Sequence, residues 1–220
     1  MKMKLKIILV LAIGILANLS CSKNPSFNYP AGTVGISKIV YFPSVSIIGQ
    51  RLIIIAQGAS YTDPGVNATL AGKNITPTTT GTVDPNTPGV YVITYSATNT
   101  EGYSSSDWRT VVVIGSDVAS NDFSGTYLRA ATGVTSTWTM DSTGVYTVEN
   151  PGGAGVGAGE TVTAVNYTGS QIAIPQQIAA AYGEVSSSDE TYNATASPVT
   201  YSWIFHAGGY GTSLRTFTKQ

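Results

Sequence analysis

Short apolar runs that alternate with polar residues dominate the chain after about residue 36. In GVYVITYSAT (89–98), every second residue from Tyr91 to Ala97 falls on one face, as in a strand with one face buried. We expect the tyrosine-bearing face to pack in the core. The run SDWRTVVVIG (106–115) indicates another strand, in which Trp108 shares a face with Thr110, Val112 and Ile114.

Two earlier runs, SKIVYF (37–42) and QRLIIIA (50–56), are also apolar and rich in β-branched residues, which favours strands. Turn-forming clusters separate these runs at short intervals: TDPGV (62–66), DPNTPG (84–89) and NTEGYSSS (99–106). Several short strands with regularly spaced turns predict a β-sandwich in this part of the chain.

One of these turns raises the question of a cation site. Asp63, Pro64 and Gly65 fit a type II turn, because proline presets the second position and glycine tolerates positive φ at the third. We expect the Asp63 side chain to bond to the turn, with Tyr61 and Val66 packed beneath it. Calcium would need six to eight oxygen ligands, and the sequence that follows, up to Asp84, supplies no carboxylate. The pattern therefore favours a structural turn.

The remainder of the chain predicts a second set of strands. FSGTYLRA (123–130) opens it, residues 135–149 predict a hairpin around DSTG, and residues 198–219 predict two closing strands around AGGYG. The glycine-rich stretch 152–160 lacks the Gly-Lys-Ser/Thr of a phosphate loop and leads into a strand pattern, which indicates a hairpin connection. The segment 175–183, with Pro175 first and Gly183 last, is the one helix candidate.

These patterns divide the chain into five segments. They are a signal segment (1–21), a tether (22–35), a first β block (36–115), a small polar linker (116–122) and a second β block (123–220).

The N-terminus has the pattern of an export signal, with lysines at positions 2, 4 and 6 before an apolar run over Ile7–Ala17. That run is shorter than the roughly 20 residues of a membrane-spanning helix. Cys21, the only cysteine, follows it in a context that resembles a bacterial lipobox. We expect Cys21 to carry a lipid that anchors the chain without spanning the membrane; an ordinary signal peptide with a chance cysteine is the alternative. The next residues, SKNPS, resemble the export signal of Bacteroidota surface lipoproteins, and a periplasmic orientation is the alternative to surface display.

The glycine two residues before Tyr91, at the start of a strand, resembles a tyrosine corner, in which the phenol bonds to nearby backbone. Together, YTDPGVNAT (61–69) and TGTVDPNTPGVYVITYSATNTEG (80–102) resemble the bacterial surface immunoglobulin-like family, which includes an Ig-like domain of insecticidal crystal toxins. The second block resembles the C-terminal domain that follows such modules in Bacteroidota lipoproteins of polysaccharide-utilisation loci. The expected fold is all-β, with an Ig-like β-sandwich followed by a second antiparallel β-sandwich or barrel-like domain.

Composition narrows the function classes. Without the three N-terminal lysines, eight basic residues face twelve acidic ones, so no basic surface for nucleic acid is expected. One histidine (His206) and one cysteine cannot form a transition-metal site, and no cofactor is expected. His206 lacks an accompanying Gly-x-Ser-x-Gly motif, and no two carboxylates are paired by the sequence as a glycosidase would need. We therefore expect no enzymatic activity.

The abundance of aromatic residues leaves one binding hypothesis. The chain has 13 tyrosines and 3 tryptophans with little charge around them, which suits stacking against sugar rings. Tyr103 and Trp108 flank a serine-rich loop, and Tyr210 lies in a glycine-rich turn that should leave its ring open. We predict these three as ligand-binding residues of a cell-surface module for extracellular glycans, beside an outer-membrane transporter of a nutrient uptake system. A structural or adhesive module with a protein partner is the alternative.

Overall fold

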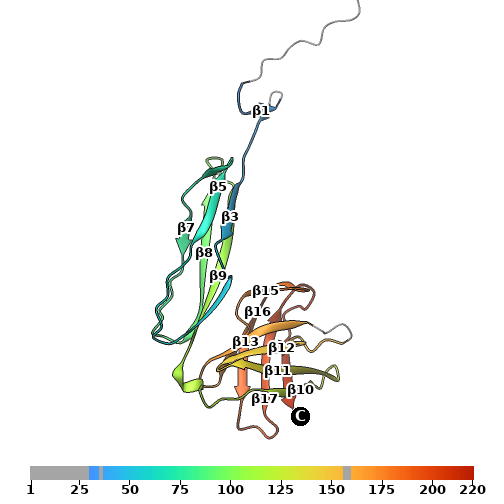
Figure 1. Cartoon of the computed structure of the whole chain (residues 1–220). Coiled ribbons are helices and arrows are strands. Elements are labelled where there is room, and N and C mark those ends of the chain that lie inside the picture. The colour runs from blue at the N-terminus through green and yellow to red at the C-terminus, as the bar shows by residue number, and fades with distance from the viewer. Residues whose placement is uncertain (1–29, 35–36, 156–159) are drawn as a thin grey trace, which may run out of the picture. The chain divides into compact units, whose positions relative to one another are not determined.

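The computed structural model describes residues 30–34, 37–155 and 160–220. The predicted lipidation site, Cys21, lies outside the described residues. Two compact units divide the chain after Val40. In the first unit, β1 (Thr33–Val34) and β2 (Ser37–Lys38) form a small antiparallel pair. The second unit contains all of the other strands, and the all-β prediction is confirmed (Figure 1).

The N-terminal part of the second unit is the expected Ig-like sandwich. One sheet has the order β3-β5-β6, and the other has the order β4-β9-β8-β7, in which β4 pairs parallel to β9 and the remaining pairs are antiparallel. The seven strands are β3 (Pro43–Ile47), β4 (Leu52–Ala56), β5 (Val66–Leu70), β6 (Lys73–Asn74), β7 (Thr78–Thr80), β8 (Gly89–Thr98) and β9 (Ser104–Ile114).

Between the two sheets, the predicted tyrosine face of β8 is buried. Ile93 and Tyr95 form a core cluster with Val111, and Tyr61 and Val66 pack against it as expected. The first predicted strand, 37–42, is only partly correct, because β2 ends at Lys38, Tyr41 and Phe42 are exposed outside the strands, and β3 begins at Pro43. The inward-facing side chains that hold β3 are Val45 and Ile47, which lie beyond the apolar run that suggested the strand.

The expected turn chemistry is present. Gly65 has a φ of 78°, and its N–H donates to Asp63 Oδ1 at 2.9 Å. The Tyr91 hydroxyl donates to the carbonyl of Thr87 at 2.7 Å, which confirms the tyrosine corner. The first bond lies within the turn before β5 and the second joins β8 to the turn before it, so the same residues that identify the fold also fix its loops.

The C-terminal part is one curled sheet of nine strands in the order β14-β13-β12-β11-β10-β18-β17-β16-β15. The Ser187 N–H donates to the Ile174 carbonyl, and the Ile174 N–H donates to the Ser187 hydroxyl, so the segment after β14 is also linked to β16 and the sheet is barrel-like. The strands are β10 (Gly125–Arg129), β11 (Val134–Ser142), β12 (Val145–Glu149), β13 (Thr161–Thr168), β14 (Gln171–Ala173), β15 (Gln177–Ala179), β16 (Gly183–Asn193), β17 (Thr200–His206) and β18 (Leu214–Lys219).

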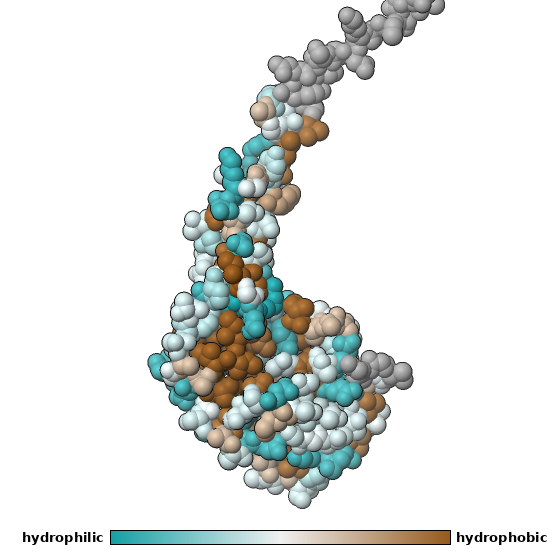
Figure 2. Space-filling view, in the orientation of Figure 1, coloured by the Kyte–Doolittle hydropathy of each residue, from teal (hydrophilic) through white to brown (hydrophobic). Residues whose placement is uncertain are grey.

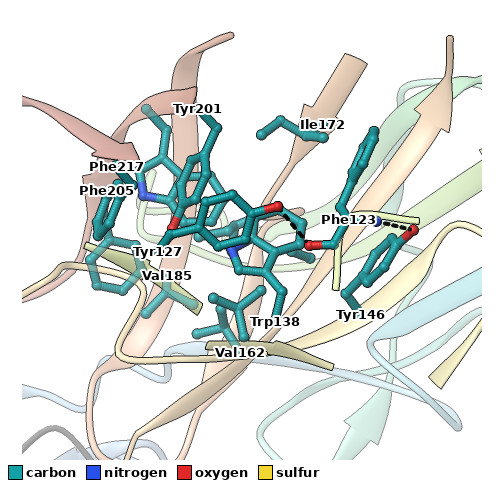
Figure 3. Close-up of a cluster of buried hydrophobic side chains, with 14 of the residues drawn as sticks. Phe123, Tyr127, Trp138, Tyr146, Val162, Ile172, Val185, Tyr201, Phe205 and Phe217 are labelled. Carbon is teal, nitrogen blue, oxygen red and sulfur yellow. Dashed lines mark hydrogen bonds between the residues drawn. The ribbon is translucent and has the colours of Figure 1, made fainter. Parts of the chain in front are cut away.

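Aromatic side chains fill the inside of this curled sheet (Figure 3). Trp138 stacks on Trp203 with ring centroids 5.4 Å apart, and Tyr201 packs edge-on against Trp138 at 5.2 Å. The Tyr127 hydroxyl donates to the Phe123 carbonyl at 2.8 Å, so a buried polar group is satisfied within the cluster. Trp138 and Trp203 are thus core residues.

The helix predicted over 175–183 is wrong, because the segment contains strand β15 and a turn. Gln177 explains the difference. Its side-chain amide accepts from Thr163 N–H at 2.9 Å and donates to the Thr163 carbonyl at 2.7 Å, so it pairs with β13 as backbone would. A helix of two turns is marginal by itself, and these bonds with the pairing of β15 to β16 stabilise the extended chain instead.

The segment 116–122, predicted as a linker, is held against β13. It opens with a 3-10 turn over Ser116–Val118, in which Val118 is fully buried. The Asp117 carboxylate accepts from the Thr168 hydroxyl at 2.7 Å and from the Gly169 N–H at 2.8 Å, and these bonds lower the pKa of Asp117. Residues 116–122 therefore form a packed connection between β9 and β10, although most of them are small and polar.

Candidate ligand-binding surface

Two exposed aromatic rings meet at one end of the Ig-like sandwich. Tyr103, one of the three predicted residues, lies in the β8–β9 hairpin tip and contacts Phe42, with ring centroids 4.8 Å apart and planes inclined by 56°. Phe42 is 63% exposed and Tyr103 is 47% exposed, and Tyr41, beside Phe42 in the chain, is exposed as well. We call Tyr41, Phe42 and Tyr103 the aromatic tip.

The hairpin that carries Tyr103 is held in shape by the buried side chain of Asn99. Its Oδ1 accepts from the N–H groups of Glu101 and Tyr103 at 3.0 and 2.8 Å, and its Nδ2 donates to the Tyr41 carbonyl at 2.7 Å. Gly102 supplies the positive φ, 88°, that closes the turn. Asn99 thus joins the segment of Tyr41 and Phe42 to the hairpin of Tyr103, so the rings are held on a fixed backbone.

The aromatic tip offers apolar ring surface beside neutral polar groups. Next to it in the hairpin, the hydroxyls of Thr98 and Ser104 bond to each other at 2.8 Å, and both side chains are exposed. An apolar surface with a few fixed polar groups is the usual composition of a small-ligand site. Phe42 was not predicted as a site residue, because the sequence placed it in a strand and nothing marked it as exposed.

Trp108 is placed differently from Tyr103. It lies within β9, and the Arg51 guanidinium covers its ring, with Cζ 4.5 Å from the ring centroid. Arg51 also pairs with Asp107 Oδ1 at 2.5 Å. Burial by itself would raise the pKa of Asp107, but hydrogen bonds from Arg51, Trp108 N–H and Ile47 N–H lower it. One face of the indole is therefore taken by a cation that is itself held in an ion pair.

The structure does not bring the three predicted residues together. Tyr103 lies in the hairpin tip just before β9, whereas Trp108 lies five positions further along, within β9 and under the Arg51 guanidinium. Tyr210 belongs to the curled sheet. The aromatic tip and Trp108 are thus two separate surfaces of the Ig-like sandwich.

The expectation of an open Tyr210 ring is wrong. The ring packs against Phe205 and Tyr182, with centroids 5.0 and 5.4 Å away, and lies close over Gly152. Arg215 donates to the Tyr210 carbonyl at 2.5 Å and stands over the ring at 5.3 Å. The glycines near Tyr210 let the chain fold the ring onto the sheet instead of leaving it free.

Polar groups elsewhere are occupied by structural contacts. His206 Nε2 bonds to the Ser188 hydroxyl at 2.8 Å, and within the described residues the imidazole has no carboxylate bonded to its other nitrogen. The Asp63 carboxylate accepts from the Tyr95 hydroxyl at 2.5 Å and lies 3.3 Å from Arg109 Nε, so protein donors occupy both of its oxygens. No group of three or more His, Cys, Asp or Glu side chains suited to a metal occurs among the described residues.

None of the helices within the described ranges has the length and apolar character needed to cross a membrane.

Comparison with known proteins agrees with the fold of the first block. Residues 45–113 match the family of Ig-like domains of bacterial surface proteins, a range that begins in β3 and ends in β9. No curated protein matches the chain. Among solved structures, a lipoprotein from Bacteroides thetaiotaomicron is similar to this chain, with 25% sequence identity and a TM-score of 0.37, over 81% of this chain and 100% of that one.

Proposed function

We propose that the protein is a lipid-anchored surface module that binds extracellular glycans without transforming them. The Ig-like domain over residues 45–113 is of the type found in bacterial surface proteins, which supports display at the cell envelope. We place the lipid on Cys21 and the anchor in the outer membrane, with the module facing outwards. The periplasmic face is the second orientation that the export pattern allows.

The observation that carries the proposal is the aromatic tip. Folded domains normally bury large aromatic rings, whereas Phe42 and Tyr103 remain about half exposed or more and contact each other on an anchored hairpin. Rings held in this way lose little conformational freedom on binding. Neutral hydroxyls beside them suit a neutral, hydroxyl-rich ligand such as a polysaccharide.

The absence of catalysis is part of the proposal. A nucleophile needs a base that is itself oriented by a third group, and the His206–Ser188 pair lacks an acid on the second imidazole nitrogen within the described residues. An outer-membrane transporter of a nutrient uptake system is the partner we propose for a glycan-binding lipoprotein. A structural or adhesive role with a protein partner is the alternative that the experiment below must separate.

The proposal is tested by affinity gel electrophoresis of residues 22–220 through gels that contain different polysaccharides. We expect at least one polysaccharide to retard the protein, and Phe42→Ala or Tyr103→Ala to weaken binding about tenfold, which corresponds to ~1.4 kcal/mol. Ile48→Ala is the matched control, because Ile48 is an exposed apolar side chain of the same sandwich outside the aromatic tip.

Two outcomes would overturn the proposal. One is that no polysaccharide retards the protein while a pull-down from cell envelopes recovers a protein partner. The other is that binding survives both aromatic-tip substitutions and disappears with Trp108→Ala, which would move the site to the other surface.

A further inference from the structure

The four edge strands of the Ig-like sandwich are protected unequally. Edge strands usually carry charges, proline or other features that prevent pairing with another chain. Strand β6 has Lys73, β7 is a run of three exposed threonines, and β3 begins with Pro43. The N–H of Ile47 at the end of β3 also donates to Asp107 Oδ2 at 3.0 Å. Strand β4, with the sequence LIIIA, has none of these features.

The pairing of β4 with β9 determines which of its backbone groups are free. Thr110 N–H donates to the Arg51 carbonyl at 2.8 Å, and Gln57 N–H donates to the Ile114 carbonyl at 2.8 Å. In a parallel pair, alternate residues of a strand bond to the same neighbour. The odd-numbered residues of β4 therefore bond to β9, and the even-numbered ones turn their N–H and C=O groups to the open edge.

These even-numbered residues are Leu52, Ile54 and Ala56. Among the described residues, the one backbone bond found for their outward groups is that from Ala59 N–H to the Ala56 carbonyl at 3.1 Å. Beside this edge lies a hollow of about 340 Å³ whose exposed lining is more apolar than polar. Figure 2 shows an apolar area on the visible face of the molecule, amid mostly polar residues. The hollow is lined by residues 54–57, 114–116, 142, 143 and 145.

We propose that β4 pairs antiparallel with β4 of a second copy of this chain, about a two-fold axis at Ile54. This register pairs Ile54 with itself and places Leu52 of the second copy opposite Ala56, so every outward group of one strand meets one of the other. The unpaired backbone groups require an extended polypeptide as the occupant. The segment can pair with itself because Leu52 and Ala56 lie at equal distances in sequence from Ile54, and none of these three residues carries a charge.

The hollow supports the same register. Ala56 lines it and is exposed, and its small side chain leaves the hollow open at the strand edge. In the two-fold arrangement, Leu52 of the second copy lies beside Ala56 and covers this apolar surface. Association would therefore combine backbone pairing with burial of apolar area, the two contributions that strand addition normally uses.

The first test is the oligomeric state of residues 22–220, a chain that lacks Cys21. In a longer chain that includes position 21, Cys21→Ser removes the thiol. We expect sedimentation to show a dimer whose fraction rises with protein concentration. Ala56→Lys places a charge at the exposed edge, and it should weaken dimerisation at least about tenfold. Asn67→Lys is the matched control, because Asn67 is exposed on β5, a central strand, and gains the same charge.

The second test fixes the register with cysteines, since Cys21 is the only native one. A mixture of Leu52→Cys and Ala56→Cys chains should form a mixed disulfide, because these Cα atoms would lie within the ~7 Å that a disulfide can bridge. Ala56→Cys chains alone should not cross-link, because two copies of position 56 would be about 14 Å apart at ~3.4 Å per residue.

A protein that remains monomeric at its highest soluble concentration overturns the proposal. So does a dimer that Ala56→Lys leaves intact, or one in which Ala56→Cys chains cross-link to each other as readily as to Leu52→Cys chains. Near-native circular dichroism and melting of each variant would show that the comparison is between folded proteins.

Discussion

At the residue scale, Arg109 connects more parts of the sandwich than any predicted residue does. Its guanidinium is fully buried and donates to the carbonyls of Gln50, Ile48 and Gly65, and it pairs with Asp63. The Asp63 turn and the bend between β3 and β4 are thereby tied to β9. A charge without solvent contact persists only when its partners are complete, so the turn motif and the buried arginine stabilise each other.

We predict that Arg109→Met destabilises the protein by roughly 3–5 kcal/mol, because Asp63 loses its cationic partner and three carbonyls each lose a donor. The free energy of unfolding in urea measures this. Arg51→Met is the control, since Arg51 forms a partly exposed ion pair with Asp107 and its loss should cost about 1 kcal/mol. Equal decreases in the free energy of unfolding for the two variants would contradict the central role of Arg109.

Tyr95 makes the same network sensitive to alkaline pH. Burial and the hydrogen bond to Asp63 raise the pKa of Tyr95 from 10.0 to about 12. The folded state therefore keeps the phenol proton between pH 10 and about 12, whereas the unfolded state loses it, and stability falls as pH rises through this range. Below pH 10, the stabilisation that the Tyr95 hydroxyl contributes to the folded state is fully present.

We predict that Tyr95→Phe lowers stability at neutral pH by about 1 kcal/mol, through the lost hydrogen bond, and weakens the alkaline decline. Above pH 10, the slope of the free energy of unfolding against pH should differ between wild type and variant by up to ~1.4 kcal/mol per pH unit. Urea unfolding across this pH range measures both effects. Parallel curves for the two proteins would show that the Tyr95 proton is held no more tightly in the fold than in the unfolded chain.

At the element scale, alternation predicted the strands whose two faces differ in burial. Strand β8, the β11–β12 hairpin and the pair β17–β18 are of this kind, and local sequence was enough for each. The prediction failed where contacts between residues distant in sequence determine the local structure. Gln177 holds its segment extended through bonds to Thr163, fourteen residues earlier, and no local pattern shows such a bond.

The candidate site was predictable to a similar extent. The loop position of Tyr103 suggested exposure, and Tyr103 is exposed. Its contact with Phe42 joins residues that are about sixty positions apart, so only the folded sandwich reveals it. For Tyr210, the flanking glycines suggested freedom, whereas the ring lies against Gly152, which has no Cβ to obstruct it. A glycine-rich turn therefore predicts backbone conformation better than it predicts side-chain exposure.

The close approach of Tyr210 to Gly152 gives a prediction for this turn. A Cβ atom at position 152 would lie 2.0 Å from Tyr210 Cε1, so Gly152→Ala must displace the ring from Phe205 and Tyr182. We expect a loss of about 1–3 kcal/mol in the free energy of unfolding, as for other overpacked sites.

A double-mutant cycle separates this clash from other effects of the substitution. Once Tyr210→Ala has removed the ring, Gly152→Ala should cost little more, which gives a coupling energy of ~0.5–3 kcal/mol. Gly155→Ala is the control, because no atom lies within 4 Å of its added Cβ. Additive losses from Gly152→Ala and Tyr210→Ala would mean that the ring does not rest on Gly152.

At the scale of the whole molecule, the second compact unit contains both the sandwich and the curled sheet. A small buried cluster joins residues from the two: Val112 and Ile114 of β9, Val118 of the 3-10 turn and Val165 of β13. Gly115 N–H also donates to the Tyr167 carbonyl at 2.8 Å. The composition of 116–122 predicted a linker, but composition does not reveal that one apolar residue in the segment is fully buried.

This cluster predicts how the protein responds to proteases. Cleavage needs an exposed segment that can be locally opened, and residues 116–122 are held by Val118 and by the bonds of Asp117. We expect limited proteolysis of wild-type protein to leave this segment intact. Val118→Asp buries an unpaired charge that only release of the segment can expose to water. The variant should therefore be cut between residues 116 and 122, into fragments that mass spectrometry can assign.

Calorimetry should give a matching result, since one cooperative transition in the wild type should separate into two when Val118→Asp disrupts the shared cluster. Ser120→Asp is the control, because it adds the same charge at an exposed position of the same segment and should change neither the cleavage pattern nor the melting curve. Wild-type protein that is cut in this segment as quickly as the variant would contradict the packed connection. In that case the sandwich and the curled sheet would have to be treated as independent domains, as the small polar composition of the segment first indicated.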